Sequence, residues 1–165
     1  MTAATAHDWI TTPATPTPTP LHARKGLIVS KSPDPPDLKA APGEIMKVVG
    51  FELDEITGSR VTGSLDLTPE HNTPYGVVHG GVYTTVIESA ASVGASVHVH
   101  DREQFAVGVN NSTDFLRPAP YGRLDVVAEP VQQGRVQQLW EVTLRSGGTL
   151  IARGTVRLQN VPLRG

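Results

Sequence analysis

The stretch GGVYTTVIESAASVGASVH, residues 80–98, decides the fold of this chain. Apolar or small side chains recur along it with the three- and four-residue spacing of a helix, at positions 82, 83, 86, 87, 90, 94 and 97. These positions cover most of the circumference instead of one narrow stripe. A helix of this kind must be enclosed by other elements, so we expect the rest of the domain to wrap around it.

Alternating runs typical of strands lie on both sides of this helix. FELDEI (51–56) and RVTGSLDL (60–67) precede it, with Gly58 in the turn between them and a short helix or turn at EIMKVV (44–49) before them. Four further runs follow, at 104–115, 122–131, 135–145 and 149–159, and SGG (146–148) separates the last two as a hairpin turn. Trp140, Val142 and Leu144 share one face of the third run, and Leu150, Ala152, Val156 and Leu158 share one face of the fourth.

This element order predicts an α+β hotdog fold, with a long central helix wrapped by a curved antiparallel sheet of about six strands. We expect the folded domain to span residues 44–165. Residues 1–43 hold eight of the 14 prolines and a Thr-Pro repeat, which is typical of a disordered N-terminal arm.

Composition excludes several classes of function. The net charge is −2 and the 14 Lys and Arg residues are scattered, so we expect no nucleic-acid partner. No apolar run approaches the roughly 20 residues of a membrane span, and the N-terminus lacks a secretory signal pattern, so we expect a cytoplasmic protein. With no cysteine in the chain, disulfides, thiolate metal sites and a thiol nucleophile are excluded.

Glu88 is the only Asp, Glu, Lys or Arg between Glu70 and Asp101. A solvated helix face normally carries several charges, so a lone carboxylate indicates chemistry, with an ordinary surface glutamate as the alternative. Gly80 and Gly81 open the same helix, where free N–H groups and the positive end of the helix dipole suit a developing oxyanion. The alternative for the glycine pair is a tight strand-to-helix turn.

Glu88 lies eight residues beyond Gly80, which is about 12 Å along a helix at about 1.5 Å per residue. A reacting carbon needs both groups about 3 Å away, so one chain cannot supply both. If the two cooperate, Glu88 must come from a second copy of the helix, and a two-fold dimer then gives two equivalent sites. Ser92, one turn further on, either orients the carboxylate or bonds back to a helix carbonyl.

Residues 44–160 resemble the hotdog acyl-CoA thioesterases, specifically the phenylacetate-degradation type and the glutamate-using branch of the 4-hydroxybenzoyl-CoA thioesterases. The resemblance is carried by GVVHGG (76–81), by the acid eight residues after the first glycine of its pair, by NNSTDFLRPA (110–119) and by RGTVRLQN (153–160). It implies hydrolysis of acyl-CoA, with an aromatic or a medium-to-long acyl chain, to a free acid and CoA.

The resemblance also implies roles for individual residues. The Gly80 N–H polarises the thioester carbonyl, and Glu88 of the partner subunit acts either as nucleophile or as general base. His79 matches the motif histidine, which is structural or orients the carbonyl, and Ser92 matches a hydroxyl residue that supports the acid.

Such enzymes usually place Asn or Gln six residues before the motif histidine, but this chain has Thr73 there, with Asn72 one step earlier. Either residue is a candidate for that role, because a one-residue insertion in HNTPYG could bring Asn72 into place.

Substrate contacts are expected from polar residues after the helix. Arginine suits the phosphates of coenzyme A, which here is part of the substrate and not a cofactor. We expect self-association as a homodimer, with pairing of dimers into a tetramer left open. The expected substrate-binding residues are Asn110, Asn111, Ser112, Thr113, Arg117 and Arg135.

Other chemistries fit the sequence less well. The histidines at 71, 79, 98 and 100 lack a third ligand at metal-site spacing, so no metal is expected. No G-x-S-x-G elbow of a serine hydrolase occurs, and a hotdog dehydratase would need a histidine-plus-acid pattern that is missing. The main alternative is a hotdog protein that binds acyl-CoA without turnover, as a sensor or carrier, although a pure binder has no need for Glu88.

Overall fold

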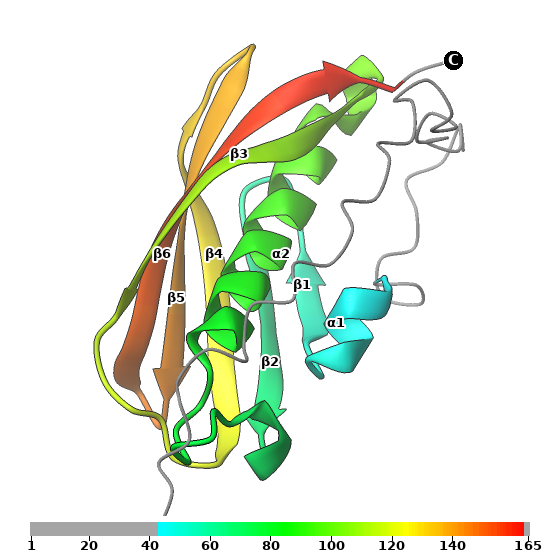
Figure 1. Cartoon of the computed structure of the whole chain (residues 1–165). Coiled ribbons are helices and arrows are strands. Elements are labelled where there is room, and N and C mark those ends of the chain that lie inside the picture. The colour runs from blue at the N-terminus through cyan, green and yellow to red at the C-terminus, as the bar shows by residue number, and fades with distance from the viewer. Residues whose placement is uncertain (1–42, 164–165) are drawn as a thin grey trace, which may run out of the picture.

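The computed structural model describes residues 43–163, so the arm expected over residues 1–43 lies outside the described residues except for Gly43. Within the described part, the elements follow the predicted order (Figure 1). The helices are α1 (Glu44–Val48) and α2 (Gly80–Val99), with short 3₁₀ helices η2 (Pro69–His71) and η3 (His100–Arg102). The strands are β1 (Glu52–Ile56), β2 (Val61–Leu67), β3 (Gln104–Phe115), β4 (Gly122–Gln133), β5 (Gln137–Ser146) and β6 (Thr149–Pro162).

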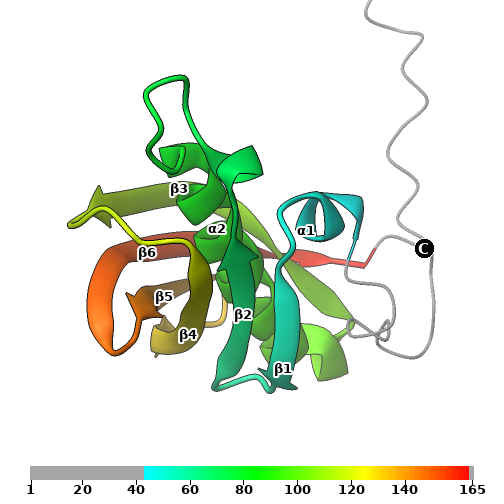
Figure 2. The ribbon, with the colours of Figure 1, turned by 90° about the horizontal axis from the view of Figure 1, so that it is seen from below.

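The six strands form one antiparallel sheet in the order β1-β2-β4-β5-β6-β3. The sheet is not closed, and it curves around α2, which lies along its concave face (Figure 2). The hairpin between β5 and β6 turns through Gly147 and Gly148, whose φ angles of 52° and 81° are those that a two-residue hairpin loop requires. The predicted hotdog architecture is therefore confirmed.

The core lies between α2 and the sheet. Small side chains on α2 let the helix approach closely, so that the Trp140 ring of β5 fills the space beside Gly94. A Cβ at position 94 would lie 2.5 Å from this ring. The buried residues of α2 are Tyr83, Val86, Ile87, Ala90, Ala91, Gly94, Ala95 and Val99.

One detail of the sequence interpretation needs correction. Leu150 does not share the buried face of β6, because a bulge near Arg145 shifts the register and Ile151 takes the buried place. Gly58 lies in the turn between β1 and β2, as predicted, and its φ is not left-handed. The Thr57 side chain closes this turn by accepting from the Arg60 N–H at 2.8 Å, and glycine suits position 58 because it lies against the backbone of His98.

α1 covers part of the open side of α2 near β1 (Figure 2). Met46 packs into the core, whereas Ile45 stays half exposed beside α2. None of the helices in residues 43–163 combines the length and the hydrophobicity that a membrane span needs.

Candidate active site

The N-terminus of α2 is capped by the side chain of the residue that precedes it. His79 Nδ1 accepts a hydrogen bond from the Gly81 N–H at 2.8 Å, and the His79 carbonyl accepts from the Val82 N–H at 2.9 Å. The His79 N–H itself donates to the His71 carbonyl at 2.8 Å, which anchors the loop to η2. Within residues 43–163 the Gly80 N–H has no acceptor, so of the two glycine amides it is the one available to a ligand.

Aromatic rings line this entrance to the helix. The Phe115 ring lies against Gly80, where a Cβ would come within 2.9 Å of it, and its centroid is 6.1 Å from that of Tyr83. Phe115 is 55% exposed, whereas Tyr83 is buried and burial raises the pKa of its hydroxyl above 10.0. The free amide therefore has an apolar wall on one side.

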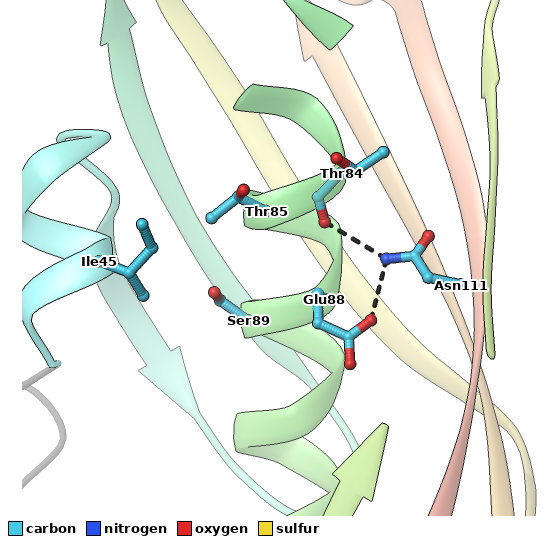
Figure 3. Close-up of a pocket in the computed structure, with 6 residues that line it drawn as sticks. All are labelled: Ile45, Thr84, Thr85, Glu88, Ser89 and Asn111. Atoms are coloured by element: carbon cyan, nitrogen blue, oxygen red, sulfur yellow. Dashed lines mark hydrogen bonds between the residues drawn. The ribbon is translucent and has the colours of Figure 1, made fainter. Parts of the chain in front are cut away.

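Glu88 lies in the middle of α2, half-buried on the side of the helix that faces β3 and α1. Its Oε2 accepts a hydrogen bond at 2.9 Å from Asn111 Nδ2, which also donates to the Thr84 carbonyl at 3.3 Å (Figure 3). Thr113 Oγ1 donates to Asn111 Oδ1 at 2.7 Å. Glu88 is thus held by a polar chain that begins on β3.

An open pocket of about 470 Å³ surrounds the carboxylate. Ile45 from α1 forms its apolar side, and hydroxyl groups from α2 line the other (Figure 3). The residues that line it are Ile45, Thr84, Thr85, Glu88, Ser89 and Asn111.

Gly108 of β3 makes room for the carboxylate. A Cβ at this position would lie only 2.0 Å from Glu88 Oε1, so any other residue would displace the oxygen. An isolated glycine inside a strand pattern indicates a bulge or a close approach, and this signal could have identified Gly108 from the sequence. The sequence contains no comparable indication for the other pocket residues Thr85, Ser89 and Ile45. Their place in the pocket depends on where α1 packs against α2.

Gly80 and Glu88 are separated along α2 as expected from their numbers, about 12 Å along the helix axis at about 1.5 Å per residue. The free amide and the pocketed carboxylate of one chain therefore lie too far apart to act on one carbon atom.

Asn72 and Thr73 make different contacts in the loop before α2. Asn72 Nδ2 donates to the Tyr121 hydroxyl, and Asn72 Oδ1 is buried with no partner within residues 43–163. The Thr73 hydroxyl donates to the Val77 carbonyl at 3.1 Å and is used within its own loop. Of the two candidates, only Asn72 keeps an unused polar atom. Tyr121 was missed from the sequence because it lies 49 positions away.

The other expected site residues make no hydrogen bond to Glu88. No side-chain hydrogen bond of Ser92 occurs within residues 43–163, and Ser92 does not line the pocket. Asn110 and Ser112 are exposed on β3. Arg117 is exposed and donates to the Leu150 carbonyl at 3.0 Å, and Arg135 is exposed in the β4–β5 turn.

The described part of the chain contains no cluster of three or more His, Asp or Glu side chains that could hold a metal ion. The polar groups around Glu88 are amides and hydroxyls from Asn111, Thr84, Thr85 and Ser89. In such surroundings a carboxylate is able to act as a nucleophile or as a proton acceptor.

Comparison with known proteins gives consistent matches. The family model described as the thioesterase superfamily matches residues 75–152. Rv1847 of Mycobacterium tuberculosis, whose name marks it as a candidate esterase, is 42% identical over 119 residues, which make up 70% of this chain and 85% of the relative. Its solved structure has a TM-score of 0.71 at 40% identity, covering 73% of this chain and 98% of that one.

Two further relatives are similar to a comparable degree. The 1,4-dihydroxy-2-naphthoyl-CoA thioesterase 2 of Arabidopsis thaliana is 40% identical over 101 residues, which make up 60% of this chain and 62% of the relative. The structure of AziG from S. sahachiroi has a TM-score of 0.70 at 39% identity, covering 73% of this chain and 98% of that one.

Proposed function

Because this chain belongs to the thioesterase superfamily, we propose that it hydrolyses the thioester bond of an acyl-CoA, releasing a free carboxylic acid and CoA. The observation that carries the proposal is Glu88, a carboxylate held at the side of an open pocket by Asn111 and given space by Gly108. An aromatic acyl group is favoured, because a relative 40% identical to the chain is named for the thioester of a dihydroxynaphthoic acid.

Two routes are open to the Glu88 carboxylate. As a nucleophile, it attacks the thioester carbon, the C–S bond breaks, CoA leaves as the thiolate, and water then hydrolyses the resulting anhydride. As a general base, it takes a proton from a water molecule that attacks the same carbon, and the thiolate leaves with a proton. A single-turnover reaction quenched early distinguishes the routes, since only the first leaves the acyl mass on the peptide that contains Glu88.

The Gly80 N–H is proposed to polarise the thioester carbonyl. It is a free donor at the positive end of a 20-residue helix, and such donors stabilise a developing oxyanion. Since Glu88 of the same chain lies about 12 Å further along the helix axis, the amide is expected to work with the Glu88 of a second copy.

The edge of the sheet supports this shared site. β3 is a 12-residue edge strand, whereas β1 at the other edge has five residues. A long edge strand offers unpaired N–H and C=O groups to another strand, and Val109 and Phe115 on β3 are each more than half exposed. Because β3 also carries Asn111, a copy paired along β3 lies next to the Glu88 pocket.

A thiol-release assay tests the activity directly. The chain has no cysteine, so a thiol reagent reports only the CoA that is released. We expect turnover of at least one acyl-CoA in a panel of aromatic and aliphatic esters, and a loss of about 10³-fold or more in Glu88→Gln. Glu52→Gln, which changes an exposed glutamate on β1 in the same way, is the matched control and should keep wild-type activity.

A protein that binds the CoA esters without releasing any thiol would overturn the enzyme assignment. Full turnover in Glu88→Gln would instead remove the role of Glu88.

The Gly80 amide can be tested by removing only its proton. Gly80 is the first residue of α2, and proline is favoured at this position because its N–H is not needed by the helix. His79 has φ −67° and ψ 128°, which suit a residue before proline. Gly80→Pro should lower kcat by about 10²-fold, the cost of one oxyanion donor. Gly80→Ala adds a Cβ but keeps the N–H, so it should retain most of the activity, and an equal loss in both variants would contradict the role.

A further inference from the structure

β3 contains a one-residue bulge beside the pocket. Gly108 pairs with Leu158 of β6 and Asn110 pairs with the next residue, Arg157, so Val109 is the extra residue. Since side chains alternate along a strand, this insertion changes which residues face α2. Gly108 and Asn111 both meet Glu88, although they are three positions apart.

In a regular strand the residues on the side of Gly108 would be Asn110 and Ser112. The bulge turns those two outwards, where they are exposed, and turns Asn111 and Thr113 towards the helix. Bulges commonly re-aim side chains next to active sites. The bulge therefore determines which of the two adjacent asparagines contacts Glu88.

The hydrogen bonds of Asn111 determine which way its amide points. A main-chain carbonyl can only accept, so the contact with the Thr84 carbonyl at 3.3 Å requires the NH₂ group on the side of the helix. The same NH₂ group donates to Glu88 Oε2 at 2.9 Å. The amide oxygen then faces Thr113, whose hydroxyl donates to it at 2.7 Å.

The two carboxylate oxygens of Glu88 consequently differ. Oε2 accepts from Asn111, whereas Oε1 lies against Gly108 and has no hydrogen-bond partner within residues 43–163. Figure 3 shows the second oxygen directed away from Asn111. The amide hydrogens of Asn111 are both in use, so Asn111 has no donor left for a substrate.

We propose that Asn111 is a positioning residue, which holds Oε2 of Glu88 so that Oε1 is the oxygen that reacts, and that Thr113 positions Asn111. This proposal rests on the proposed function, because it concerns the same carboxylate. Because Asn111 contacts Glu88 and has no donor left for the substrate, substituting Asn111 should change kcat and leave KM almost unchanged.

Kinetics of four variants test this assignment. Asn111→Ala removes the donor, and Asn111→Asp keeps the size of the side chain but replaces the NH₂ group by an oxygen. Both should lower kcat by about 10- to 100-fold, the usual effect of losing a hydrogen bond to a charged group, with KM within about twofold of wild type. Thr113→Val should lower kcat by about 3- to 10-fold, and Thr113→Ser, which keeps the hydroxyl, should restore it.

Thr143→Val serves as the matched control, because Thr143 lies on β5 between buried Val142 and Leu144 and therefore on the outer face of the sheet. It should leave kcat unchanged, and melting curves of all five proteins show which remain folded.

Glu88→Gln is measured in parallel to separate the two proposals. Absence of thiol release in the wild type overturns the proposed function. Turnover in Glu88→Gln equal to wild type removes the role of Glu88 and, with it, the positioning role of Asn111. An inactive Glu88→Gln together with wild-type kcat in both folded Asn111 variants overturns the positioning role alone. A rise in KM with kcat unchanged would also overturn it, since that result assigns Asn111 to substrate binding. If kcat falls as far in Thr113→Ser as in Thr113→Val, the hydroxyl of Thr113 does not position Asn111.

Discussion

Substituting Gly108 by alanine should remove activity while leaving the fold intact. The added Cβ would lie 2.0 Å from Glu88 Oε1 and 3.1 Å from its carboxyl carbon. Ordinary contact begins at 3.4 Å, so the oxygen must retreat by about 1.4 Å, and misplacing a reacting group by about 1 Å can cost about 10²-fold in rate. The displaced atoms are the end of a flexible side chain, so the strand itself need not move.

The two consequences are measured separately. Thiol release from the best acyl-CoA substrate should show kcat lower by at least about 100-fold. Urea unfolding should show a free energy of unfolding equal to that of the wild type or slightly higher, since alanine costs a strand less entropy than glycine by about 0.5–1 kcal/mol.

Gly63→Ala on β2 is the contrasting control. Its Cβ would lie 2.2 Å from the Glu52 carbonyl oxygen and 2.7 Å from the Phe51 ring, and the backbone cannot yield cheaply. We expect a loss of about 1–3 kcal/mol of stability, with kcat per folded molecule retained. If Gly108→Ala keeps wild-type kcat, then Glu88 Oε1 does not react from its place against β3, and the reasoning is refuted.

Further predictions concern the helix and its aromatic neighbours. Gly94→Ala places a Cβ 2.5 Å from the fully buried Trp140 ring, so the free energy of unfolding in urea should fall by about 1–3 kcal/mol. An unchanged urea midpoint would contradict this close packing. His79→Ala removes the side-chain cap of α2 and should lower the free energy of unfolding by about 1 kcal/mol in the same assay. An unchanged free energy of unfolding would contradict the capping role. Because burial raises the pKa of Tyr83 above 10.0, its neutral form stabilises the fold below that pH, and this contribution is lost as pH rises through the raised value. The tyrosinate absorbance should therefore show an ionisation phase above pH 10.0 that is absent from Tyr83→Phe, and a titration curve unchanged by this substitution would contradict the burial of the hydroxyl.

Most of the fold follows from local patterns. The sequence predicts the long helix from the spacing of apolar residues between Gly80 and His98, and the last hairpin from the Gly147-Gly148 turn. Both features depend only on neighbouring residues. The interpretation of Leu150 was wrong because a single bulge reverses which residues face the core, and a bulge is a property of two paired strands.

The candidate site shows the same division. Glu88 could be identified because a lone charge in an apolar helix is visible in the sequence. The choice of Asn111 over Asn110 could not be made, because it depends on the register of β3 against β6. The partner of Asn72, Tyr121, comes from a loop that only the folded sheet brings near it.

The central claim is that one site combines the Gly80 amide of one subunit with Glu88 of another. Gly80→Pro and Glu88→Ala proteins can be refolded together in equal amounts. Half of the resulting dimers are mixed, and each mixed dimer has one intact site, so the mixture should recover about a quarter of wild-type thiol release from two inactive variants. If both groups belonged to a site within one chain, the mixture would stay as inactive as the separate variants, and that result would contradict the shared site.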